Sequence, residues 1–244
     1  MSSEAPWFEV AFGELYPVLY AHRDDASAAG ETEFTVRTLD LEPGDRVLDL
    51  GCGGGRHLRG LSAAGITAVG MDLSKALLDD NAARGGERLV RADMRRLPFG
   101  PGTLDAVVSF FTSFGYFASD HEDRLVLREV ARVVRPGGRY LLDYLDAREV
   151  GANVVPRSEK TVGGYQIVEA RRIEDGRVKK QVWIRRTSDG EEAVAYEESV
   201  RLYSPAELEA MIDAVGFDVR KRFGALDGRA LGEGGRCVIA AVRR

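Results

Sequence analysis

The chain has few of the residues that cross-link small proteins or bind transition metals. Its 244 residues include only two cysteines, Cys52 and Cys237, and three histidines. The cysteines form no C-x-x-C pair and no metal-like cluster with the histidines, so the sequence predicts neither a disulfide framework nor a metal site. A reduced protein inside the cell is the simplest expectation.

Long apolar runs and an excess of basic residues are missing as well. No stretch approaches the roughly 20 apolar residues that cross a bilayer. The opening residues, MSSEAPWFEV, lack the basic and apolar segments of a secretory signal. The formal net charge is -5, whereas nucleic-acid-binding proteins usually carry a basic field. We therefore expect a cytoplasmic protein with neither a membrane nor a nucleic acid as partner.

Short apolar runs alternate with helical segments from Arg46 to Asp146. Five runs are short and continuously apolar, as buried parallel strands are, and they span residues 47–50, 68–71, 89–92, 106–111 and 140–142. Ser74 and Ser119 stand where they would cap the helices that follow, and Pro136-Gly137-Gly138 is expected to end the second of these helices. The alternation predicts an α/β fold, a Rossmann-like, doubly wound, mostly parallel sheet. Residues 217–223 and 237–242 would complete it to seven strands.

Residues 151–203 have a different pattern. The turn signals Asp175-Gly176 and Asp189-Gly190 separate strand-like segments at 165–174, 177–186 and 191–203. They predict a three-stranded antiparallel β insert, which serves either as a substrate lid or as the surface of a homodimer. The remaining divisions are an N-terminal helical lid (1–40), the ligand-binding core (41–150) and a C-terminal helix and strands that complete the core sheet (204–244).

A glycine loop follows the first strand, in VLDLGCGGGRH. Its pattern is acid-x-G-x-G-x-G, formed by Asp49, Gly51, Gly53 and Gly55. The dinucleotide fingerprint would have glycine at position 56, where Arg56 stands, and no G-x-x-x-x-G-K-[ST] phosphate loop is present. Such a loop suits a ligand that has an ammonium group and a nucleoside but no phosphate.

Two more acids, Asp72 and Asp93, fall at or near the ends of the next two strands. In open α/β sheets the carboxyl ends of the strands face one ligand crevice. With these acids and the glycine loop, residues 45–146 resemble the class I S-adenosylmethionine (SAM)-dependent methyltransferases. The implied cofactor is SAM, and its product is S-adenosylhomocysteine (SAH).

The resemblance assigns roles to individual residues. It implies that Asp49 and the loop glycines lie under the methionine half of SAM, with Cys52 as a small loop residue beside the ligand. Asp72 would accept both ribose hydroxyls, and Asp93 would accept from the adenine amino group. Leu73 and Met94 would pack against the adenine, and Phe110 or Phe111 would line the wall beyond the fourth strand.

The acceptor side is expected after the fourth strand and in the N-terminal segment. The run FFTSFGYF (110–117) supplies Ser113 and Tyr116, and it lacks the acid-or-Asn, Pro-Pro-aromatic motif of enzymes that methylate DNA bases. Tyr16 and Tyr20 share one helical face. With Arg23 and the insert, they are similar to the lid of small-molecule N-methyltransferases that act on amino sugars.

These residues give the acceptor-site hypothesis. Tyr20 and Tyr116 are the candidate catalytic residues, Tyr16 and Ser113 would bind the substrate, and Arg23 would pair with the SAM carboxylate. An alternative is that Tyr16 and Tyr20 simply pack the N-terminal segment onto the core. Because metal-ligand spacing is missing, a nitrogen nucleophile is favoured over an oxygen.

Two other functions stay open. A SAM-binding regulator or partner subunit without catalysis would carry the same cofactor motif. An NAD-binding Rossmann-type oxidoreductase is disfavoured by Arg56 and Asp93. The partner expected for the methyltransferase is a small molecule whose accepting atom the sequence leaves undefined.

Overall fold

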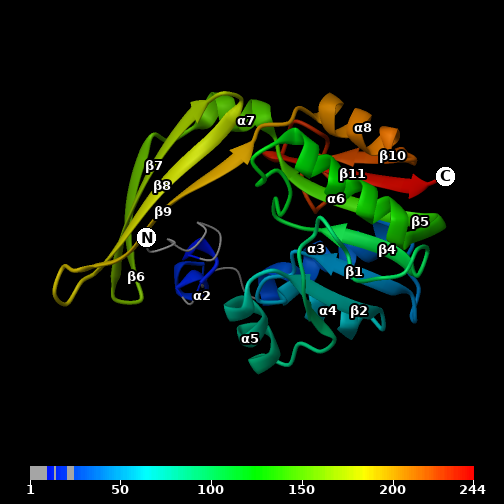
Figure 1. The fold of residues 1–244 in the computed structure, drawn as a ribbon, viewed down its shortest axis with the longest axis horizontal. Coiled ribbons are helices and arrows are strands. Elements are labelled where there is room, and N and C mark those ends of the chain that lie inside the picture. Colours follow the sequence, from blue (N-terminus) through cyan, green and yellow to red (C-terminus); the bar gives the residue numbers. More distant parts are fainter. Residues whose placement is uncertain (1–9, 14, 21–24) are drawn as a thin grey trace.

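Two β-sheets organise the chain, one mostly parallel and one antiparallel (Figure 1). The computed structural model describes residues 10–13, 15–20 and 25–244. The strands of the main sheet are β1 (Arg46–Leu50), β2 (Thr67–Asp72), β3 (Leu89–Arg91), β4 (Leu104–Ser109), β5 (Val134–Leu145), β10 (Phe217–Phe223) and β11 (Arg236–Arg243). Their spatial order is β10-β11-β5-β4-β1-β2-β3, and β11 alone pairs antiparallel with both neighbours. The predicted seven-stranded Rossmann-like fold is confirmed.

The strand order changes direction beside β1. The chain runs outward from β1 to β2 and β3, and then returns to place β4 on the other side of β1. This is the topological switch point, where the connections on either side of β1 diverge and leave a crevice beyond the carboxyl ends of the strands. The glycine loop leaves β1 at that point.

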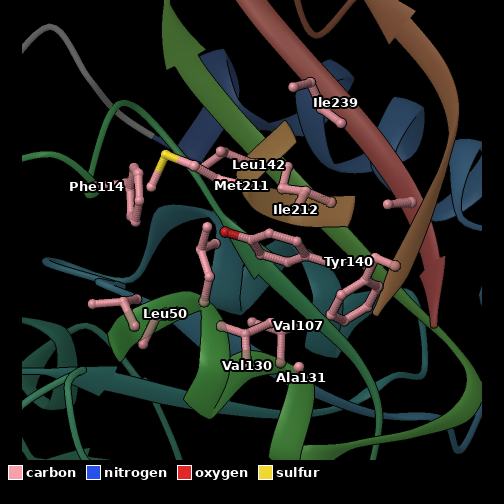
Figure 2. Packing of buried hydrophobic residues seen from close by; sticks show 14 of the residues in the cluster. Leu50, Val107, Phe114, Val130, Ala131, Tyr140, Leu142, Met211, Ile212 and Ile239 are labelled. Carbon is pink, nitrogen blue, oxygen red and sulfur yellow. The ribbon is translucent and has the colours of Figure 1, made fainter. Parts of the chain in front are cut away.

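Helices cover both faces of the main sheet. The helices among the described residues are α2 (Tyr16–Leu19), α3 (Asp25–Thr38), α4 (Arg56–Ala63), α5 (Lys75–Ala83), α6 (Asp120–Val133), α7 (Ala147–Asn153) and α8 (Pro205–Ala214), of which α2 packs on the insert instead. One buried cluster joins α3 and α4 to one face of the sheet, and a second joins α6 and α8 to the other. Figure 2 shows Tyr140 of β5 among Val107 of β4, Val130 and Ala131 of α6, and Ile212 of α8. Burial of these apolar faces, worth roughly 25 cal/mol per Å², holds the layers together.

Local signals placed the helix starts correctly, but one helix end was wrong. Ser74 and Ser119 cap α5 and α6, each accepting from the backbone N–H three residues on. Such caps stabilise a helix by about 1 kcal/mol. The expected stop at Pro136-Gly137-Gly138 is not what ends α6: the backbone is already extended at Val134, where β5 begins. The PGG segment lies inside β5, which is longer than the predicted strand because it also pairs at its start with β4.

The insert has four strands, not the predicted three. They are β6 (Arg157–Val162), β7 (Tyr165–Glu174), β8 (Arg177–Arg186) and β9 (Glu192–Arg201), paired in that order. Strand β6 was missed because its residues, RSEKTV, are mostly polar and exposed at the sheet edge. The Gly163-Gly164 turn, with both φ angles positive, was the available signal for this hairpin.

The short helix α2 lies beside the insert (Figure 1). Leu19 of α2 is buried in a cluster with Ile167, Val182 and Ile184 of the insert. This packing holds the tyrosines of α2 and its C-cap between the insert and the main sheet. In the part of the chain that the structure describes, no helix is long and apolar enough to cross a membrane.

Candidate cofactor and acceptor site

A cavity of about 860 Å³ opens at the carboxyl ends of the central strands. Its walls come from the glycine loop, the β2, β3 and β4 exits, the N-terminal segment and the insert. The predicted site residues that line it are Tyr16, Tyr20, Asp49, Gly51, Cys52, Gly53, Gly55, Asp72, Leu73, Asp93, Met94, Phe110, Ser113 and Tyr116. Arg23 lies outside the described residues. The structure therefore brings the predicted cofactor and acceptor residues to one cavity, while their individual roles stay predictions.

The glycine loop packs directly against the segment that follows β4. Gly51 has a φ of +79°, and a Cβ built on it would lie 2.6 Å from the Cβ of Ser113. Only glycine allows both this backbone conformation and this approach. The glycine loop and the segment that follows β4 are consequently held in contact.

Asp49 is a buried carboxylate without a protein partner. It is 1% exposed, and neither carboxylate oxygen has a hydrogen bond to any described residue. Its pKa is raised to about 7, first by burial and then by the charge of Asp72, while Arg56 opposes the shift. A buried charge of this kind is unfavourable unless something pairs with it. A ligand ammonium in the cavity would satisfy it, which fits the amino group of SAM.

Asp72 joins the glycine loop to the start of α5. Its Oδ2 accepts from the backbone N–H of Gly53 at 2.8 Å, and its Oδ1 accepts from that of Ser74 at 2.9 Å. Burial raises the pKa of Asp72, although these backbone donors pull it down. Each carboxylate oxygen accepts more than one hydrogen bond. The carboxylate is thus fixed in orientation and still able to receive ribose hydroxyls.

Asp93 has a partner that the sequence did not suggest. The Arg95 side chain donates to both of its carboxylate oxygens, and the Arg95 backbone N–H donates to Oδ1 at 2.8 Å. The hydrogen bond from Arg95 lowers the pKa of Asp93. Arg95 also reaches Glu122 of α6. The acid predicted to meet adenine is therefore part of an ion-pair network at this end of the cavity.

The segment after β4 has an unusual backbone. Phe111 and Thr112 have φ angles of +52° and +62°, a left-handed conformation that is uncommon outside glycine. Asp143 of β5 holds them: its Oδ2 accepts from the Phe111 N–H at 2.8 Å, and its carbonyl accepts from that of Thr112. Arg236 pairs with the other carboxylate oxygen at 2.7 Å. Asp143 thus fixes the segment that carries Ser113 and Tyr116.

Phe110 precedes this segment and lines the cavity from a buried position. Its ring is buried and stacked on His57 at 4.0 Å between centroids. His57 in turn contacts Glu31 at 2.7 Å, and burial lowers the pKa of its imidazole. Phe110 contributes to the wall from a fixed position in the core.

Asn81 of α5 is a loop-supporting residue that the sequence analysis missed. Its side chain is buried, and its Nδ2 donates to the Gly53 carbonyl at 3.4 Å. Arg59 donates both to the Asn81 side-chain oxygen and to the Gly54 carbonyl. Asparagine has a low helix propensity, so its presence inside a helix was the available sequence signal that Asn81 has another role.

Aromatic rings line the end of the cavity where the acceptor is predicted. The Tyr16 and Tyr20 rings lie 4.5 Å apart, and Phe12 contacts both Tyr16 and Tyr116, with centroids at 5.5 and 5.9 Å. Burial, followed by the charge of Glu198, raises the pKa of Tyr116 well above its usual range, so its phenol is protonated. The surface is apolar with phenol oxygens, as the acceptor hypothesis requires.

The insert contributes to this end in two ways that the sequence did not reveal. Arg177 of β8 donates to the carbonyls of Gly115 and Phe117, at 3.2 and 2.9 Å, and so holds the two neighbours of Tyr116. Lys180 and Glu198 line the cavity itself.

Comparison with known proteins agrees with this site. Residues 47–138 match the family model described as a methyltransferase domain. Over 107 residues the chain is 40% identical to the demethylmenaquinone methyltransferase of Corynebacterium kroppenstedtii, and this segment covers 43% of the chain and 44% of that relative. The chain thus spans less than half the length of that relative.

Solved structures extend the likeness to the whole fold. A SAM-dependent methyltransferase from Clostridium acetobutylicum superposes with a TM-score of 0.79 at 15% identity, covering 94% of this chain and 96% of the other. The SAM-bound amino pentose methyltransferase CalS10 of Micromonospora echinaspora gives 0.71 at 21% identity, covering 95% and 98%. Residues 47–138 therefore match a methyltransferase domain, the whole chain has the fold of solved SAM-dependent methyltransferases, and SAM is the cofactor that these comparisons support, as predicted.

Proposed function

We propose that the protein transfers a methyl group from SAM to a nitrogen atom of a small molecule. The observation that carries the proposal is the single cavity, which joins the unpaired carboxylate of Asp49 to the aromatic wall of Tyr16, Tyr20 and Tyr116. A protein that only bound SAM would need the Asp49 carboxylate but not the aromatic wall.

The residues present fit SAM. The orphaned Asp49 carboxylate matches an ammonium, and Asp72, held by two backbone donors, faces the same cavity for the ribose. The loop backbone at Gly51 and Gly53 lines it without side chains. When bound, SAM supplies a methyl group on a sulfonium, which is already electrophilic.

The chain itself then has to align the acceptor atom with the methyl group and exclude water from around it. Such positioning is worth about 7–11 kcal/mol in well-oriented reactions. Tyr20 and Tyr116 would orient the acceptor by their phenols, Ser113 would receive a polar group, and the rings of Phe12 and Tyr16 would exclude water. An amine needs only to arrive unprotonated, which favours nitrogen over a hydroxyl. The amino pentose methyltransferase among the similar structures acts on an amine-bearing class of molecule by its name, and supports the same choice.

We further propose that the insert, residues 151–203, works as a lid over the acceptor. Lys180 and Glu198 reach the cavity, and Arg177 holds the Tyr116 segment. The insert lies outside the segment 47–138 that matches the family model, so its part in the function is argued from its own contacts.

Product detection tests the proposal. The purified protein is incubated with SAM and a panel of small amines, phenols and alcohols, and products heavier by one methyl group are sought by mass spectrometry together with SAH. Methylated amines with stoichiometric SAH are expected. Methylation of phenols or alcohols alone would move the acceptor atom to oxygen, and SAM binding with no product from any acceptor would favour a SAM-binding regulator.

A further inference from the structure

A charged pair lies on the inner face of the insert, between apolar and charged neighbours. Lys180 of β8 and Glu198 of β9 are cross-strand partners, so their side chains lie on the same face. Along β8, the neighbours on that face are Val178 and Val182, and Val182 is buried in the cluster that receives α2. Arg171 of β7, the other cross-strand neighbour of Lys180, pairs with Glu169 on the same face, so Lys180 and Glu198 belong to a charged strip and line the cavity from it.

The pair is close to the catalytic candidate Tyr20. The Lys180 Nζ lies 2.9 Å from Glu198 Oε1 and donates to the Tyr20 phenol oxygen at 3.2 Å. The Lys180 and Glu198 side chains are only 15% and 13% exposed, and both line the cavity. Burial alone would lower the pKa of Lys180, but the charge of Glu198 outweighs it and raises the pKa, so Lys180 is an ammonium.

Stability does not explain such a pair. Replacing a buried ion pair with apolar residues is often neutral or stabilising, because desolvation offsets the attraction between the charges. A pair that lines a cavity has another use, since it presents one hydrogen-bond donor and one acceptor side by side to a ligand.

We propose that Lys180 and Glu198, with Tyr20, receive a hydroxyl group of the acceptor, so that the substrate class is an amino alcohol. A hydroxyl donates one hydrogen bond and accepts others, which matches a carboxylate beside an ammonium. A second ammonium at this place would be attracted by Glu198 but repelled by Lys180, and a carboxylate the reverse, so neither gains a net charge interaction with the pair. The pair thus selects a neutral polar neighbour of the reacting amine. This inference rests on the proposed function and names its acceptor.

Matched ligands test the inference by binding, without requiring turnover. The full chain is saturated with SAH, and Kd values are measured by calorimetry or ligand-observed NMR for pairs that differ only in the hydroxyl. The panel begins with trans-2-aminocyclohexanol and cyclohexylamine. We expect at least one amino alcohol to bind about tenfold or more tightly than its matched amine, because the analogue leaves buried polar groups unpaired.

Two variants test whether the preference for amino alcohols over matched amines comes from Lys180 and Glu198. Glu198→Gln and Lys180→Met should reduce the preference to less than threefold while leaving SAH affinity unchanged. Lys179→Met is the control, because Lys179 is the next residue of β8, on the opposite face, where it pairs with Glu174; it should keep the full preference. A wild-type protein that binds SAH but shows no preference in any pair overturns the inference, as does a preference that survives in Glu198→Gln. Failure to bind SAH, or SAH binding without any methylated product, would count instead against the proposed function.

Discussion

The side-chain oxygen of Asn81 occupies the space that a methyl group on Gly55 would need. Gly55 has a φ of +77° and caps α4, while Asn81 belongs to α5, which follows β2 along the chain. The cofactor loop is therefore shaped as much by a distant helix as by its own glycines.

This relationship predicts opposite effects for two glycine substitutions. Gly55→Ala forces both a strained φ and a clash with Asn81, and should lower the melting temperature by about 5 °C or more. Gly30→Ala is the control, because Gly30 lies in α3 with nothing within 4 Å of its would-be Cβ. It should stabilise the protein by roughly 0.5–1 kcal/mol. Calorimetric melting of both variants checks this, and a Gly55→Ala melting temperature equal to wild type would show that the loop relaxes freely.

The parts of the site that were predictable depend on local pattern. Asp49, Gly51 and Asp72 stand at fixed places relative to strand ends, and parallel strands bring those ends to one edge of a sheet. Their convergence on one cavity therefore followed from the order of elements along the chain.

The parts that were missed depend on register between distant strands or on side-chain competition. Lys180 meets Glu198 only because β8 and β9 pair in one register, and neither residue differs in the sequence from the other charges of the insert. The pairing of Arg95 with Asp93 was missed because spacing in the sequence does not decide which acid an arginine side chain contacts. Strand β6 shows no alternation of apolar and polar residues, because it is an exposed edge strand.

Asp49 should make the unliganded protein less stable as the pH rises. Its pKa is raised from 3.8 to about 7, so between these values the folded protein keeps a proton that the unfolded chain has released. Stability therefore falls as the pH increases from about 4 to about 7, by a few kcal/mol at most. Asp49→Asn removes this contribution. Urea unfolding at several pH values should show the variant losing less stability than wild type across this window; parallel curves would mean that Asp49 does not titrate there.

The same carboxylate should make SAM binding depend on pH. Above pH 7 Asp49 is ionised and can pair with the ligand ammonium, so SAM affinity should be higher at pH 8 than at pH 6. In the Asp49→Asn variant, affinity should be about tenfold or more weaker at pH 8 and show a smaller change with pH. Titrations at both pH values decide it, and an affinity unaffected by the substitution would remove Asp49 from the cofactor site.

Asp72→Ala should abolish measurable SAM binding. The substitution removes the proposed ribose acceptor and also frees the backbone N–H groups of Gly53 and Ser74. Asp79→Ala is the control, because Asp79 is an exposed residue of α5 whose partner is Lys75. Circular dichroism would establish that the Asp72→Ala variant is folded. Folded protein that binds SAM normally would contradict the ribose role.

Tyr20→Phe should lower kcat more than SAM affinity, because the phenol oxygen faces the acceptor end and receives a hydrogen bond from Lys180. A loss of roughly tenfold is expected for one positioned hydrogen bond. Tyr165→Phe is the control, since Tyr165 packs beside α2 in the same hydrophobic cluster. Steady-state rates with the acceptor found by mass spectrometry check the prediction. Equal rates for both variants would make Tyr20 a packing residue.

Calorimetric titration of the purified protein with SAH, SAM and NAD tests the central claim most directly. The account predicts that SAH and SAM bind at micromolar concentrations to one site per chain, and that NAD does not bind. No heat from SAH or SAM, with or without the amine panel present, would contradict the assignment of the cavity, and binding of NAD would point to an oxidoreductase.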